Sequence, residues 1–124
     1  MPHRLLSEGW IAAVNDLDAP VVTPVRLNLS IVDTEHPGGR VDASVDTTAG
    51  RLTVARASVT AVDVHVATDY ETALAIVRSI EATTALDAFL AGRILVQGGV
   101  MPLIALGGEI LGSPIASAVA SLTA

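Results

Sequence analysis

The chain has 124 residues, of which 51% are hydrophobic, and it carries a formal net charge of −6 with no cysteine. This length predicts a single domain over residues 1–124, and the absence of cysteine excludes disulfides, thiolate zinc sites and a cysteine nucleophile. An acidic chain with one Phe, one Trp, one Tyr and no basic run is a poor match for nucleic acid or anionic lipid headgroups.

The first part of the chain predicts a helix followed by a β-hairpin. Apolar residues at helical spacing predict a helix near Ser7–Leu17, with the Ser7 hydroxyl as its N-cap. Alternating apolar and polar residues predict strands at Val25–Ile31 and Val41–Asp46, on either side of a Pro-Gly-Gly turn. This alternation is typical of a sheet with one buried face and one solvated face.

The middle of the chain predicts two more strands and then a helix. Arg51–Arg56 reads as a short strand. The run Ser58–Thr68 is rich in β-branched residues, but its alternation changes phase near Ala61, which predicts a bulge or a break there. The apolar period then becomes helical over Asp69–Ile80, and the segment Thr68–Glu71 matches a capping box.

The last part of the chain predicts three short helical segments and one strand. The helices are expected at Thr84–Leu90, at Met101–Leu106 and after the Ser113-Pro114 cap, and the strand at Arg93–Gln97. Mostly short turns between the strands favour a mainly antiparallel sheet of five strands. With the helices grouped on one side of that sheet, the expected class is α+β.

The C-terminal quarter is poor in charge, because Glu109 is its one charged residue between Ile94 and Ala124. Two interpretations compete: an ordinary core with a capping helix, or a surface that faces a ligand or a partner. The charge-free runs on either side of Glu109 are 15 residues each and contain Gly and Pro, whereas a membrane span needs about 20 apolar residues. We therefore expect a cytoplasmic protein with no stable membrane insertion.

Several short motifs follow one another in a recognisable order from the fourth predicted strand onward. They are Thr68-Asp69 at a helix entry, then Phe89, Gly92-Arg93-Ile94, Val96, Gly98 and Met101 to Leu103. In this order and spacing they resemble the sterol carrier protein 2 family, a lipid-transfer domain. The upstream hairpins and the segment Gly50–Val54 fit the same layout, so the resemblance covers roughly Val25–Leu106.

The resemblance implies a hydrophobic small molecule, such as a fatty acid, an acyl chain or a sterol, in an apolar tunnel between the sheet and its helices. It implies a carrier without a cofactor. A dry, empty tunnel of ~400 Å³ would cost on the order of 10 kcal/mol, so the tunnel should hold lipid, hold water or collapse. The side chains expected to line it are Leu29, Val45, Val54, Val64, Leu74, Val77, Phe89, Ile94, Val96, Met101, Leu103, Ile104, Leu106, Ile110, Leu111, Ile115 and Val119.

Catalytic candidates are few. Asp63 and His65 lie two residues apart on one strand face, where a carboxylate beside an imidazole would form a general base. A solvated strand face accounts for the same pair without catalysis and is the favoured interpretation. The scattered histidines predict no metal site. Two alternatives to a carrier stay open: a cyclase or isomerase acting on a polyketide or steroid-like substrate in the same pocket, and an interaction domain that forms a homodimer through its apolar tail.

Overall fold

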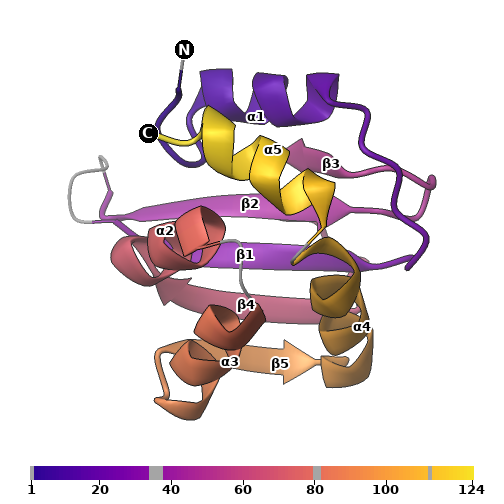
Figure 1. The fold of residues 1–124 in the computed structure, drawn as a ribbon. Helices are drawn as coiled ribbons and strands as arrows, with labels where there is room; N and C mark the ends of the chain where they lie inside the picture. Colours follow the sequence, from indigo (N-terminus) through magenta and orange to yellow (C-terminus); the bar gives the residue numbers. More distant parts are fainter. Residues whose placement is uncertain (1, 34–37, 80–81, 112) are drawn as a thin grey trace.

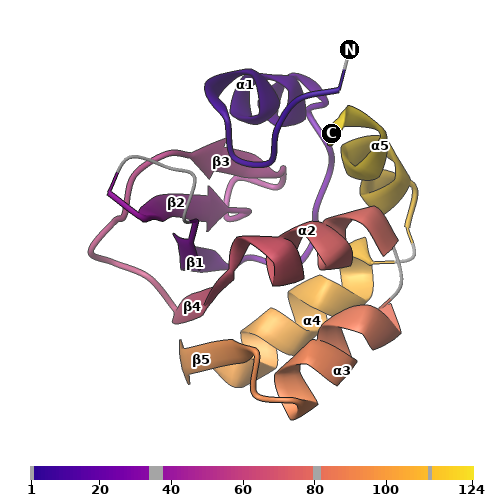
Figure 2. The ribbon, with the colours of Figure 1, turned by 90° about the vertical axis from the view of Figure 1, so that its left-hand side faces the viewer.

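The computed structural model describes residues 2–33, 38–79, 82–111 and 113–124. Its strands form one sheet, and its helices gather on one face of that sheet (Figures 1 and 2). In chain order the elements are α1 (Glu8–Asp16), β1 (Arg26–Val32), β2 (Arg40–Asp46), β3 (Thr53–Ala55), β4 (Val64–Asp69), α2 (Tyr70–Ser79), α3 (Ala82–Leu90), β5 (Ile94–Gly98), α4 (Val100–Ile110) and α5 (Pro114–Leu122).

The sheet has the strand order β3-β2-β1-β4-β5. The pairs β1–β2, β2–β3 and β4–β5 are antiparallel, whereas β1–β4 is parallel. The parallel pair arises because the chain does not turn back after β3. It crosses the face away from the helices and enters the sheet beside β1 (Figure 2). The prediction of a mainly antiparallel sheet of five strands is confirmed.

The connection from β3 to β4 explains why the fourth strand is shorter than predicted. The strand begins at Val64 rather than near Ser58, and the change of phase near Ala61 marks the irregular segment before it. Asn28, on the outer face of β1, holds this segment. Its side-chain nitrogen donates to the Val59 carbonyl at 2.7 Å, and the Val59 N–H donates to its side-chain oxygen at 3.0 Å.

The entry to α2 differs from the predicted capping box by one residue. Asp69, not Thr68, caps the helix: its carboxylate accepts from the Thr72 N–H at 2.7 Å and from the Thr72 hydroxyl at 2.9 Å. The Thr68 hydroxyl donates instead to the Arg93 carbonyl at 2.8 Å. The helix was expected to run to Ile80, which lies outside the described residues.

A dense core lies between α1 and the strands β1 to β3. Val14 on α1, Ala43 on β2 and Val54 on β3 are buried there. Trp10 is buried with them, and its ring N–H donates to the Thr123 hydroxyl at 2.9 Å, which anchors α1 to the end of the chain. The two terminal segments also pair through a parallel bridge, so they lie side by side (Figure 1).

Helix α4 is longer than the predicted one or two turns, because it continues through Gly107 and Gly108 to Ile110. The one charged residue of α4 fixes the position of its last turn. The Glu109 carboxylate accepts from the Val22 N–H at 2.6 Å and the Thr23 N–H at 2.8 Å, so it ties the last turn to the segment before β1. Within the described residues, no single helix has the length and apolar composition to cross a membrane. Helices α4 and α5 pass that test only as a pair bent by 84°.

Candidate ligand-binding site

Helices α2 to α5 each bury fewer of their residues than α1, in which Trp10 and Val14 are both buried. Each of these helices has one buried residue among those described, namely Thr72, Ala88, Leu106 and Ala116. Three of the four are small or polar, although the helices are largely apolar. The apolar side chains that pack only partly against the core are Leu29, Val45, Val66, Tyr70, Ala73, Leu74, Val77, Val96, Leu103, Ile110, Ile115, Val119 and Leu122, with Ile11 from α1. The layer between the sheet and these four helices is therefore apolar, and many of its side chains are only partly buried.

The residues predicted to line a tunnel fall into three groups by exposure. Val54, Val64 and Leu106 are buried. Phe89, Met101 and Ile104 are exposed, at 44%, 74% and 60%. The half-buried group is Leu29, Val45, Leu74, Val77, Ile94, Val96, Leu103, Ile110, Leu111, Ile115 and Val119. Most of this last group comes from the sheet and from α2, α4 and α5.

A cleft of ≈ 450 Å³ opens where β1 and β4 end and α2 begins. Its side chains are Arg4, Val32, Asp33, Asp69, Tyr70, Glu71 and Leu74. Arg4 lies over the Tyr70 ring, 4.4 Å from its centre, and pairs with the buried Asp33 carboxylate at 2.8 Å. Leu74 belongs both to this cleft and to the half-buried apolar layer, so the cleft adjoins that layer.

The polar lining of the cleft is mainly acidic, with three carboxyl groups to one guanidinium. The Thr72 backbone N–H, which donates to Asp69, lowers the pKa of that carboxyl below its usual value. Asp69 therefore keeps its negative charge at neutral pH. Sequence reasoning missed this cleft because Arg4, Asp33 and Tyr70 lie far apart in the chain and match no local motif.

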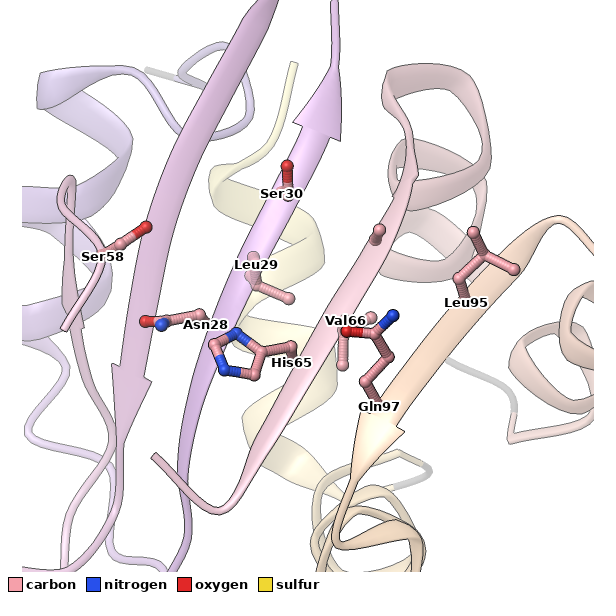
Figure 3. Close-up of a pocket in the computed structure, with 9 residues that line it drawn as sticks. Asn28, Leu29, Ser30, Ser58, His65, Val66, Leu95 and Gln97 are labelled. Atoms are coloured by element: carbon pink, nitrogen blue, oxygen red, sulfur yellow. The ribbon is translucent and has the colours of Figure 1, made fainter. Parts of the chain in front are cut away.

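A second pocket, of ≈ 300 Å³, lies on the outer face of the sheet (Figure 3). His65 sits there opposite Asn28 on one neighbouring strand and Gln97 on the other, and Ser58 reaches it from the β3–β4 connection. The pairing with Asp63 considered from the sequence does not form: the Asp63 carboxylate accepts from the Arg26 N–H at 2.9 Å. In the described part of the chain, no hydrogen bond links Asp63 to His65.

The pocket around His65 therefore lacks the carboxylate that would orient an imidazole for proton transfer. Both Asp63 and His65 are exposed, and His65 lies on the face opposite the apolar layer. Of the other histidines, His3 pairs with the C-terminal segment and His36 lies outside the described residues. Over the ranges that the structure covers, no group of three His, Asp or Glu side chains is arranged to hold a metal ion.

The sequence matches no protein-family model and, at a significant level, no curated protein. Solved structures do share its architecture. Sterol carrier protein 2 like 2 from Aedes aegypti aligns over 82% of this chain and 89% of its own, with a TM-score of 0.60 and 24% identity. The palmitated form of SCP2L2 from the same organism aligns over 81% and 86%, with a TM-score of 0.59 and 24% identity. A conserved hypothetical protein from Thermus thermophilus, possibly a sterol carrier protein, aligns over 100% and 94%, with a TM-score of 0.62 and 14% identity.

These alignments extend over most of both chains and include all five strands in the Thermus thermophilus case. The chain therefore has the fold of sterol carrier protein 2. The fold implied by the order of motifs in the sequence is confirmed, as is the α+β class with helices on one face of the sheet.

Proposed function

We propose that this chain binds and carries a hydrophobic small molecule between the inner face of its sheet and helices α2 to α5. The observation that carries the proposal is the unequal burial of the two halves of the molecule. Val14 on α1 and Val54 on β3, beside α1, are buried, whereas apolar residues such as Leu74 and Leu103 are only half-buried. A ligand that entered this layer would complete the burial that the chain leaves unfinished.

The sharing of a fold with a palmitated protein supports this proposal, since palmitate is a hydrophobic chain. Burial supplies the driving force, at roughly 0.8 kcal/mol for each CH₂ group removed from water. A chain of about ten CH₂ groups would thus gain about 8 kcal/mol, which offsets the cost of association. No side chain has to move a proton or form a covalent bond for this function.

The charge of the cleft beside α2 bears on which ligands fit. Asp33, Asp69 and Glu71 outnumber Arg4 there, and Arg4 is already engaged by Asp33 and Tyr70. An anionic end group such as a carboxylate or a CoA phosphate would be repelled by this lining. We propose that the preferred cargo has an uncharged polar end, as a sterol or a fatty alcohol does.

Direct binding tests the function. A fluorescent sterol and a fluorescent fatty acid are titrated into the full chain, and unlabelled fatty alcohol competes for the site. The variant Leu103→Asp should weaken binding at least tenfold, because it places a charge in the apolar layer. The matched control is Val59→Asp, since Val59 is a half-exposed residue on the opposite face of the sheet. It should bind as the unchanged chain does.

Three results would overturn the proposal. One is the absence of saturable binding of any of the three ligands to the folded chain. Another is equal weakening by Leu103→Asp and Val59→Asp. The third is unchanged affinity in a Leu103→Asp variant whose circular dichroism shows that it is folded. If Leu103→Asp fails to fold, titration of the unchanged chain still decides whether the site exists.

The alternative of an enzyme in the same pocket has no support from the residues first considered for it. Asp63 bonds to the backbone of β1, and His65 lies on the outer face of the sheet. An enzyme would need a polar group directed into the apolar layer. The buried polar side chains that the structure describes, such as Asn28, Thr47 and Thr123, are engaged in hydrogen bonds to the protein.

A further inference from the structure

The two edges of the sheet are treated differently. At the β3 edge, the Asn15 side chain of α1 donates to the Val54 carbonyl at 2.9 Å and accepts from the Val54 N–H at 2.8 Å. An element of the protein itself therefore covers the backbone groups of that edge. At the other edge, β5 pairs with β4 on one side, and no strand of the described residues lies beyond it in the sheet.

The register of the β4–β5 ladder shows which groups of β5 point outward. The Gly99 N–H donates to the Asp63 carbonyl at 2.8 Å. Because bonded pairs alternate in an antiparallel ladder, Leu95 and Gln97 also bond toward β4, and the N–H and C=O groups of Ile94, Val96 and Gly98 point away. Among the described residues, no other group bonds to these outward atoms.

This edge lacks the usual features that prevent pairing with another strand. The segment Ile94–Gly98 contains no charged residue and no proline, which are the features that protect exposed edges in other proteins. Exposed apolar side chains surround it on α3, β5 and α4, three elements that lie together at one end of the sheet (Figures 1 and 2). The largest are Leu86, Phe89, Leu90, Leu95, Met101 and Ile104, each between 44% and 74% exposed.

We call β5 and these six side chains the edge surface. Each of the six leaves a large fraction of its apolar surface in contact with solvent, which a partner chain would cover. The charge of the edge surface differs from that of the rest of the chain. Between residues 82 and 106 the charged residues are Asp87 and Arg93, which cancel, whereas the whole chain carries −6. Two copies can therefore approach here without the repulsion that they meet elsewhere.

We propose that the edge surface is the interface of a homodimer, in which two copies pair antiparallel along β5 with the twofold axis at Val96. In this register Val96 faces the partner's Val96, and Ile94 faces the partner's Gly98. All the outward groups of β5 are then bonded, and the two sheets become one continuous sheet. The interface goes beyond the proposed carrier function, and neither proposal requires the other.

The same register accounts for the apolar side chains on both sides of β5. Helix α3 precedes β5 and α4 follows it, so antiparallel pairing brings α3 of one copy beside α4 of the other. Leu90 on α3 then faces Met101 or Ile104 on the partner's α4, and the contact occurs twice. A lipid surface would cover the same side chains, but it would leave the outward N–H and C=O groups of β5 without partners, which is costly in an apolar medium.

The test measures self-association and locates it. Sedimentation equilibrium of the full chain should show a concentration-dependent dimer below about 100 μM, a range typical of modest interfaces. The variant Leu95→Lys places two like charges at diagonal positions across the twofold axis. It should raise the dimer dissociation constant at least tenfold. Val59→Lys is the matched control on the same face of the sheet and should leave the constant unchanged.

Hydrogen exchange on the unchanged chain tests the register without any variant. The amide hydrogens of Ile94, Val96 and Gly98 should exchange more slowly as the protein concentration rises, because they are bonded only in the dimer. A monomer at all concentrations, or a dimer in which these amides exchange at the monomer rate, would overturn the proposal. So would binding of the monomer to phosphatidylcholine vesicles that Leu95→Lys abolishes, since a lipid surface would then be the occupant.

Discussion

Removing side chains from the two halves of the core should separate stability from ligand binding. Val14→Ala removes two carbons from a fully buried site, which costs ~1.6 kcal/mol of transfer free energy plus a cavity term, or about 3 kcal/mol in total. Leu103→Ala removes three carbons, but from a half-buried site where part of the side chain is already in contact with solvent. Its cost to the free energy of unfolding should be only about 1 kcal/mol.

Ligand binding should be weakened more by Leu103→Ala than by Val14→Ala. A ligand that binds only the folded chain raises the free energy of unfolding, by about 2.7 kcal/mol at a concentration of 100 times its dissociation constant. Urea denaturation of both variants and of the unchanged chain, with and without a fatty alcohol, measures this increment. Val14→Ala should keep the full ligand-induced increase in the free energy of unfolding, because Val14 lies on α1, in the other part of the core. Leu103→Ala should lose a substantial part of it.

The result that would refute this reasoning is a large loss of stability in Leu103→Ala without ligand. A cost as high as that of Val14→Ala would mean that the layer beneath α4 is packed as solidly as the core beneath α1. An increment that is the same in Leu103→Ala and in the unchanged chain would show that Leu103 does not contact the ligand. Equal unfolding slopes in urea must accompany the comparison, because a change in slope signals a change in the denatured state.

Three other predictions rest on single contacts. Asp69→Ala removes the cap of α2 and should lower the free energy of unfolding by about 1 kcal/mol in urea denaturation, whereas Glu71→Gln should change it by less than ~0.5 kcal/mol. The hydrogen bonds that Glu109 accepts from Thr23 and Val22 hold the pKa of its carboxyl below the usual 4.5. The stability that the Glu109 carboxylate contributes is therefore fully present above pH 4.5, and it is lost as the pH falls through the lowered pKa of the folded chain. The amide NMR shift of Val22 should follow that acid titration, and Glu109→Gln should abolish it; a shift that titrates unchanged in the variant would exclude Glu109 as the cause. Val77→Phe should fill the apolar layer, so ligand binding falls while the free energy of unfolding stays level or rises; a loss of about 1–3 kcal/mol would instead indicate a solid core.

Local sequence patterns were enough to place most of the elements. The alternation of Leu27 and Ile31 with Asn28 and Ser30 placed β1, and the Ser113-Pro114 pair placed the start of α5. These signals act over a few residues, through side-chain direction and backbone hydrogen bonds, so they survive without tertiary information. These patterns located the ends of the elements less accurately. At α2 the carboxylate of Asp69, and not the hydroxyl of Thr68, caps the helix. The Thr68 hydroxyl bonds instead to the Arg93 carbonyl at the start of the neighbouring strand.

The candidate site could be predicted only in part. Apolar residues at helical or alternate spacing show which side chains point inward, so most of the expected lining lies on the inner face. The spacing does not show how closely the helices approach the sheet. Phe89, Met101 and Ile104 keep the period of their helices, yet they are exposed.

The sequence by itself determined the secondary structure, the one-sided placement of the helices and the apolar character of the last quarter. The tertiary structure alone decided that β4 lies parallel to β1, that Arg4, Asp33 and Tyr70 meet, and that the β5 edge is uncovered while Asn15 covers β3. The physical reason is separation along the chain. Contacts between residues tens of positions apart depend on how all the elements pack together, and no local pattern of side chains encodes that packing.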